Sequence, residues 1–104
     1  MSLRPPQQYG TSSATGIGPN PLEIEIAGEK AAALGRSGER VEQTLAKLKA
    51  LERGAPERAV SLKEAAEAVY AYFIQRELCG MRRHHDVIRE YGIPNEVLVR
   101  LGAK

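Results

Sequence analysis

The chain has 104 residues and contains no tryptophan, one phenylalanine and one cysteine. The shortage of large aromatic side chains limits the core, and a small domain already buries a smaller fraction of its surface than a large one. A lone cysteine, Cys79, excludes an internal disulfide and is typical of the cytosol. No apolar run reaches membrane-spanning length and no signal segment opens the chain. We therefore expect a cytoplasmic protein with no membrane contact.

Strong charge of one sign is also missing. The sequence holds 15 Lys and Arg against 13 Asp and Glu, interleaved along the chain, for a net charge of +2. That balance does not by itself indicate a nucleic acid or an anionic membrane as partner. Phosphate-binding glycine loops, nucleophile elbows and HExxH motifs are absent as well. The sequence therefore predicts neither an enzyme nor a cofactor.

Residues 1–19 are rich in proline, glycine, serine and threonine and have no apolar periodicity. We predict a flexible tail there and a single helical domain over residues 20–104. A first helix begins after Asn20, a good N-cap residue, with Pro21 at its first position. Apolar residues then recur at helical spacing until about residue 53, where Gly54 and Pro56 end the helix.

A second long helix is predicted from Ser61 to Tyr91. Ser61 and Glu64 have the spacing of a capping box, and Gly92 ends the helix. Its apolar face is wide, as expected for a helix that contacts more than one neighbour. Pro94 then begins a short C-terminal helix.

These elements predict an all-α fold, an antiparallel hairpin of two long helices plus a short C-terminal helix. A hairpin alone leaves apolar surface in water, so we expect a homodimer that completes a four-helix bundle. The alternative is a monomer whose last helix folds back over the hairpin, with bends at residues 35–38 and at Gly80. A turn near Glu57 would place Gly35 level with Cys79 and Gly80.

Small residues on both predicted helices, together with Met81 and Ile88, form the candidate helix crossing or interface. Glycine within a helix costs about 1 kcal/mol relative to alanine, so its repeated use needs a reason. Two explanations remain open, a close approach by another chain segment or a break in the first helix. The candidate residues are Gly28, Ala31, Gly35, Gly38, Cys79, Gly80, Met81 and Ile88.

Residues 79–86 are the one place where cysteine, histidine and aspartate crowd together. An enzyme or metalloprotein centred there is one alternative function. However, on a continuous helix His84 and His85 would point about 100° apart, and a structural zinc site needs four ligands. The simpler expectation is that one histidine is packed and the other is solvated.

Residues 83–101 suggest another alternative, a DNA-binding helix-turn-helix with its turn at Gly92. Ile88 stands where that motif usually has a small residue, and basic side chains are few. We therefore regard a nucleic-acid partner as unlikely. The residues that would contact it are Arg82, Arg83, Arg89, Asn95 and Arg100.

Residues 76–82, RELCGMR, together with YGIP at residues 91–94, resemble the C-terminal part of small uncharacterised bacterial all-helical proteins. The resemblance implies a compact helical fold and transfers no catalytic or binding residue. The function that the sequence favours is a self-associating protein-interaction module, acting as a homodimer or on an unknown protein partner.

Overall fold

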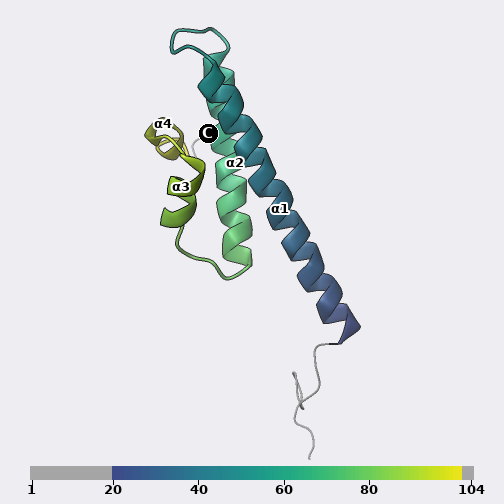
Figure 1. The fold of residues 1–104 in the computed structure, drawn as a ribbon. Helices are drawn as coiled ribbons and strands as arrows, with labels where there is room; N and C mark the ends of the chain where they lie inside the picture. The colour runs from purple at the N-terminus through teal and green to yellow at the C-terminus, as the bar shows by residue number, and fades with distance from the viewer. Residues whose placement is uncertain (1–19, 102–104) are drawn as a thin grey trace, which may run out of the picture. The chain divides into compact units, whose positions relative to one another are not determined.

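The computed structural model describes residues 20–101, which are all-helical and contain no strand (Figure 1). The predicted tail at residues 1–19 lies outside the described residues. The helices are α1 (Pro21–Ala50), α2 (Arg58–Leu78), α3 (His85–Tyr91) and α4 (Asn95–Leu98). The chain divides into two units, Met1–Ala31 and Ala32–Lys104.

The start of α1 is confirmed at the predicted cap. The side-chain oxygen Oδ1 of Asn20 accepts a hydrogen bond from the backbone N–H of Glu23 at 2.8 Å, which satisfies one of the free N–H groups of the first turn. The helix continues through residues 35–38, so the predicted alternative of a break there is wrong. It ends at Ala50, slightly before the predicted residue 53.

The start of α2 differs from the prediction. The helix begins at Arg58, and the backbone N–H of Ser61 already bonds the carbonyl of Glu57 at 3.1 Å. Ser61 is therefore an interior residue of the helix, 1% exposed, with no protein partner for its hydroxyl. The predicted capping box is wrong because the helix begins three residues earlier, at Arg58, so Ser61 does not occupy the N-cap position.

The prediction of one long second helix is wrong, because α2 ends at Leu78. Gly80 has a left-handed backbone with φ of +90°. The N–H of Met81 bonds the carbonyl of Arg76 at 2.9 Å, and the N–H of Gly80 bonds that of Glu77 at 3.0 Å. This pair of bonds is the Schellman motif that ends many helices. The chain reverses there, and α3 begins at His85.

The predicted stop at Gly92 is confirmed, and it uses the same motif. Gly92 has φ of +63°, and the N–H of Ile93 bonds the carbonyl of Ile88 at 2.9 Å. Pro94 then precedes the single turn of α4. Two left-handed glycines thus set the path of the chain between α2 and α4.

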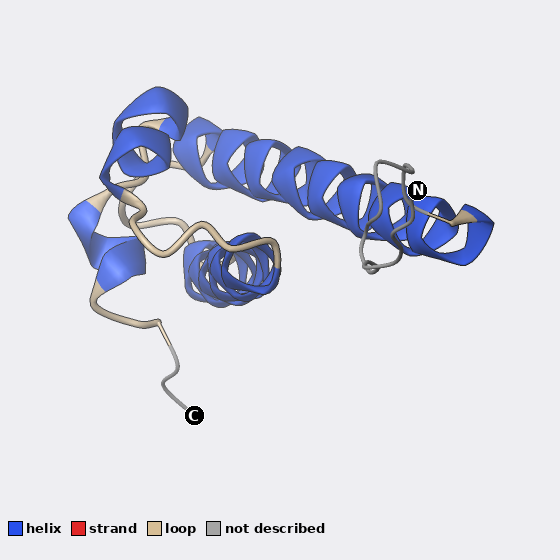
Figure 2. Ribbon diagram, turned by 90° about the horizontal axis from the view of Figure 1, so that it is seen from below, coloured by secondary structure: helices blue, strands red, loops and turns tan. Residues whose placement is uncertain are grey.

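The core lies inside the unit that begins at Ala32. Here α1 and α2 form the antiparallel hairpin that the sequence predicts, and α3 and α4 cover one side of it (Figure 2). The monomer alternative predicted such a fold-back with bends at two places; of these two, the structure has the one at Gly80, and α1 is continuous through residues 35–38. The buried apolar residues are Val41, Leu45, Leu48, Ala65, Ala66, Ala68, Val69, Tyr72, Val87, Ile93 and Val97.

A bidentate ion pair joins α2 to α4. The guanidinium of Arg58 donates to Glu96 through Nη1 to Oε1 at 2.8 Å and through Nη2 to Oε2 at 2.6 Å. This bidentate geometry is the strongest form of an arginine–carboxylate contact. It lowers the pKa of Glu96 and raises that of Arg58, each chiefly through the hydrogen bond to the other.

Candidate interaction surface

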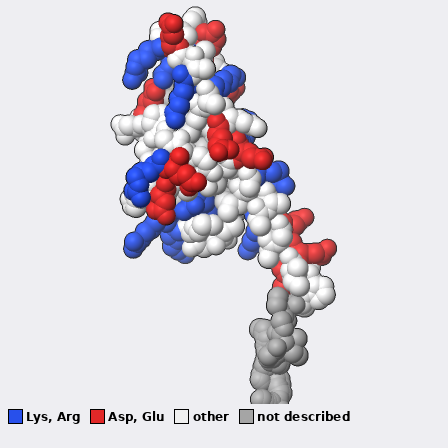
Figure 3. Space-filling view, in the orientation of Figure 1, with Lys and Arg blue, Asp and Glu red and all other residues white. Residues whose placement is uncertain are grey.

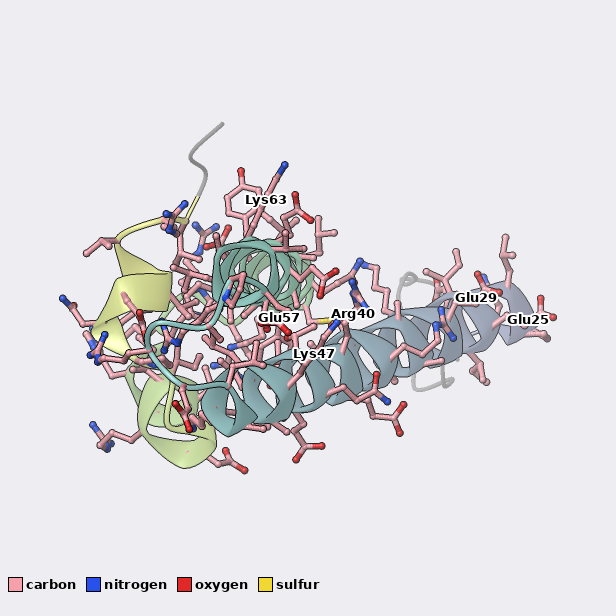
Figure 4. All side chains as sticks on the ribbon, turned by 90° about the horizontal axis from the view of Figure 1, so that it is seen from above. Glu25, Glu29, Arg40, Lys47, Glu57 and Lys63 are labelled. Carbon is pink, nitrogen blue, oxygen red and sulfur yellow. The ribbon has the colours of Figure 1, made fainter. Side chains whose placement is uncertain are left out.

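An open groove of about 560 Å³ lies between α1 and α2, within the unit that begins at Ala32. Its α2 side includes Tyr70 and Ile74, which are 49% and 39% exposed. Arg36 and Arg40 are exposed along its α1 side, and Figure 4 shows Arg40 beside α2. The groove is therefore apolar inside with a basic edge. Its full lining is Ala33, Arg36, Ser37, Arg40, Tyr70, Ala71, Ile74 and Gln75.

The N-terminal turns of α1, residues 21–31, form a second apolar surface. Leu22, Ile24 and Ile26 are 63%, 58% and 48% exposed. Leu22 and Ile26 surround a shallow depression together with Glu25 and Glu29. Figure 4 labels these two glutamates on their helix, and Figure 3 shows acidic side chains gathered over these turns. This surface is apolar with an acidic edge.

Of the predicted small-residue contacts, the structure shows a tight one at Gly38. A Cβ atom at Gly38 would lie 3.1 Å from Oη of Tyr91 and 3.4 Å from Cε1 of Tyr72. At Gly28 and Gly35 a Cβ atom would have nothing within 4 Å. Gly35 is thus not packed against the level of Gly80, and the close contact that a glycine permits is made by tyrosines at Gly38.

Tyr72 and Tyr91 meet edge to face over Gly38. Their ring centroids are 5.6 Å apart, with an interplanar angle of 78°. Hydrogen bonding to Tyr72, followed by burial and by the charges of Glu42 and Glu90, raises the pKa of Tyr91 to about 12. This tyrosine pair joins α3 to the hairpin, and nothing in its surroundings lowers the pKa as a catalytic base would require.

The segment 79–86 holds the chain reversal together. Arg76 donates from Nε to Nδ1 of His84 at 3.1 Å and from Nη2 to the carbonyl of Arg83 at 2.9 Å. Because Nδ1 accepts, the proton of the neutral imidazole is on Nε2, which lies 3.1 Å from the carboxylate of Glu77. The His84 ring stacks on Phe73 at 4.1 Å.

These contacts confirm that one histidine is packed and the other solvated, since His85 is exposed. Cys79 is partly buried at the end of α2. Among residues 20–101, no three His, Cys, Asp or Glu side chains are placed to hold a metal ion together. The arrangement of Arg76, His84 and Glu77 can fix a loop, because every polar atom of the imidazole is already engaged.

The C-terminal segment places the predicted nucleic-acid residues on the surface but presents little to a groove of DNA. The residues Arg82, Arg83, Arg89, Asn95 and Arg100 are all exposed. However, α4 has only four residues, and Val97 at its centre is fully buried. On the face drawn in Figure 3, basic and acidic side chains alternate without forming a continuous basic surface. A recognition helix in the major groove is usually longer and more basic.

The model of a family of unknown function, DUF6665, matches residues 1–104. The chain belongs to this family. Comparison with curated proteins and with solved structures finds no significant match.

Over residues 20–101, no helix combines the length and the apolar content needed to cross a membrane.

Sequence reasoning missed the groove itself, although its signal is present. Tyr70 and Ile74 are four residues apart on α2, and Arg36 and Arg40 are four apart on α1. Each pair therefore lies on one face of its helix. The wide apolar face predicted for the second helix includes Tyr70 and Ile74. Which residues of α1 lie beside them depends on the register of the hairpin, so the basic edge could not be predicted.

Proposed function

We propose that this protein is a self-associating helical module that acts through protein–protein contact, with the α1–α2 groove as its binding surface. The observation that carries the proposal is the exposure of neighbouring apolar side chains along α2. Tyr70, Ile74 and Leu78 follow one another at helical spacing and are 49%, 39% and 61% exposed. Exposed apolar groups that cluster in this way commonly mark an interaction site.

The described residues give less support to nucleic-acid binding, catalysis or metal binding. Nucleic-acid binding would depend on the short α4 and on dispersed arginines. Catalysis or metal binding at residues 79–86 would compete for His84, because both of its ring nitrogens already contact Arg76 and Glu77. A cytoplasmic location remains part of the proposal, because a single cysteine is typical of proteins in reducing compartments.

The test is the mass of the full-length chain in solution. We expect sedimentation velocity and light scattering to show a reversible dimer as the concentration rises from about 1 to about 100 µM. The double variant Tyr70→Ser/Ile74→Ser should shift that equilibrium to monomer, because it removes apolar area from the groove. The matched control Val99→Ser changes an apolar residue that is 71% exposed and lies outside the groove. A wild-type chain that stays monomeric throughout would contradict the proposal.

A further inference from the structure

The groove and the N-terminal turns of α1 have complementary properties. The groove presents Tyr70 and Ile74 beside the cations Arg36 and Arg40. The N-terminal turns present Leu22 and Ile26 beside the anions Glu25 and Glu29. Each surface is apolar with one charged edge, and the two edges have opposite signs. The N-terminal turns therefore match the groove in both respects, with apolar side chains for its apolar interior and anions for its cationic edge.

The two sets of residues on α1 also share one spacing. Leu22, Glu25, Ile26 and Glu29 are followed after eleven residues by Ala33, Arg36, Ser37 and Arg40. Eleven residues are about three turns of an α-helix, so the interval returns to nearly the same helical phase. The first set is acidic and the second is basic. A helix with this pattern is complementary to an antiparallel copy of itself.

The register of such a pairing follows from residue numbers. In two antiparallel helices, residues whose numbers have the same sum lie level with each other. The numbers of Glu25 and Arg40 add to 65, and so do those of Glu29 and Arg36. One register therefore matches both ion pairs at once, and a twofold axis repeats them to give four. The same register places Ala32 of one copy level with Ala33 of the other, where small side chains allow the helices to approach closely.

We infer that the groove of each copy is occupied by the N-terminal turns of α1, residues 21–31, from a second copy, in a reciprocal antiparallel pairing. This inference rests on the proposed function and names the partner segment. Leu22 and Ile26 of the incoming helix cover Tyr70 and Ile74. The pairing is isologous, because each copy supplies one groove and one segment.

The experiment reverses the charges on each side separately. In Glu25→Arg/Glu29→Arg every predicted pair becomes arginine against arginine, and in Arg36→Glu/Arg40→Glu every pair becomes glutamate against glutamate. We expect each double variant alone to raise the dimer dissociation constant at least about tenfold, because four exposed attractions become four repulsions. Circular dichroism of each variant shows whether it keeps its helix content.

The decisive experiment mixes the two double variants. In the mixed dimer all four pairs again join arginine to glutamate, so we expect a heterodimer with a dissociation constant close to that of the wild type. Native mass spectrometry identifies it, because the two variants differ in mass. Rescue by mixing also shows that the loss in each variant alone comes from pairing and not from misfolding.

The control variant Glu42→Arg/Glu90→Arg reverses two exposed charges that act on Tyr91 instead of the groove. We expect it to dimerise like the wild type. If both double variants dimerise like the wild type, self-association stands and this pairing is overturned. If they are monomeric and mixing restores nothing, the pairing is overturned as well. A monomeric wild type overturns the proposed function and this inference together.

Discussion

The two parts of α1 are held in different ways. Residues 21–31 are all exposed, and the Asn20 cap is their clearest local support. In the part that follows, Val41, Leu45 and Leu48 are at most 2% exposed and pack in the core. Both parts are helical, but one depends on local sequence and the other on tertiary packing.

This difference bears on assembly. In proteins most of the stability of a helix comes from packing of its apolar face and not from helix propensity. The first eleven residues of α1 place their apolar side chains in solvent, whereas a typical surface helix turns that stripe toward a core. A partner that covers Leu22 and Ile26 would give these turns the support that Leu48 receives from the core.

The largest expected contrast comes from truncating one apolar residue in each part. Leu48→Ala should destabilise the fold by about 2–5 kcal/mol, because the side chain is fully buried and its removal leaves a cavity. Ile26→Ala should change the stability of the monomer by less than about 0.5 kcal/mol, because Ile26 is 48% exposed. Urea denaturation at low protein concentration measures both. Equal losses would show that residues 21–31 are packed as tightly as the core.

A smaller contrast compares two glycines of α1. Gly35→Ala should stabilise the protein by about 0.5–1 kcal/mol, because alanine favours a helix and its Cβ meets nothing within 4 Å. Gly38→Ala should instead destabilise it by up to about 2 kcal/mol, since its Cβ would press on Tyr91 and Tyr72.

Thermal denaturation of the two single variants gives the comparison directly. The same gain in stability in both variants would mean that the tyrosines move aside without cost. Gly38 would then not be required for the packing of α3.

The smallest expected effect is on the way the free energy of unfolding depends on pH in the acid range. The hydrogen bonds from Arg58 lower the pKa of Glu96 below its ordinary range, so the folded state favours the carboxylate. This contribution is fully present above about pH 4.5 and is lost as the pH falls through the lowered pKa. In Glu96→Gln the loss of stability that protonation of Glu96 causes in acid should disappear.

Amide NMR signals recorded during acidification sharpen the comparison. Those of α4 should respond to protonation of Glu96 in the wild type and should lose that response in Glu96→Gln. A Glu96→Gln chain with an unchanged acid profile would show that the ion pair with Arg58 does not contribute to stability.

Local signals explain how much of the fold could be predicted. The cap at Asn20 and the stop at Gly92 act within a few residues, and both were predicted correctly. The start of α2 was not, because Arg58 is held by Glu96, which is 38 residues away in the sequence. A pattern read along one helix contains no information about such a partner.

The break at Gly80 was predicted only within the monomer alternative, and the favoured prediction of one long second helix was wrong for a related reason. Apolar residues keep helical phase from Phe73 past the glycine to Val87, so a continuous helix explained them. In the structure the chain reverses, and Val87 is buried by packing back against the same core. The candidate surface was predicted only in part, since its apolar residues were on the expected face but the basic edge depends on the hairpin.

The reversal at Gly80 has a consequence for how copies of this chain can exchange parts. Residues 79–84 connect the hairpin to α3 and α4, and the contacts of Arg76 with His84 and Arg83 hold that connection closed. A loop that closes a domain onto itself can also open and let the same segment cover a neighbouring copy, which is domain swapping. The Arg76 contacts therefore favour the arrangement in which α3 and α4 pack on their own hairpin.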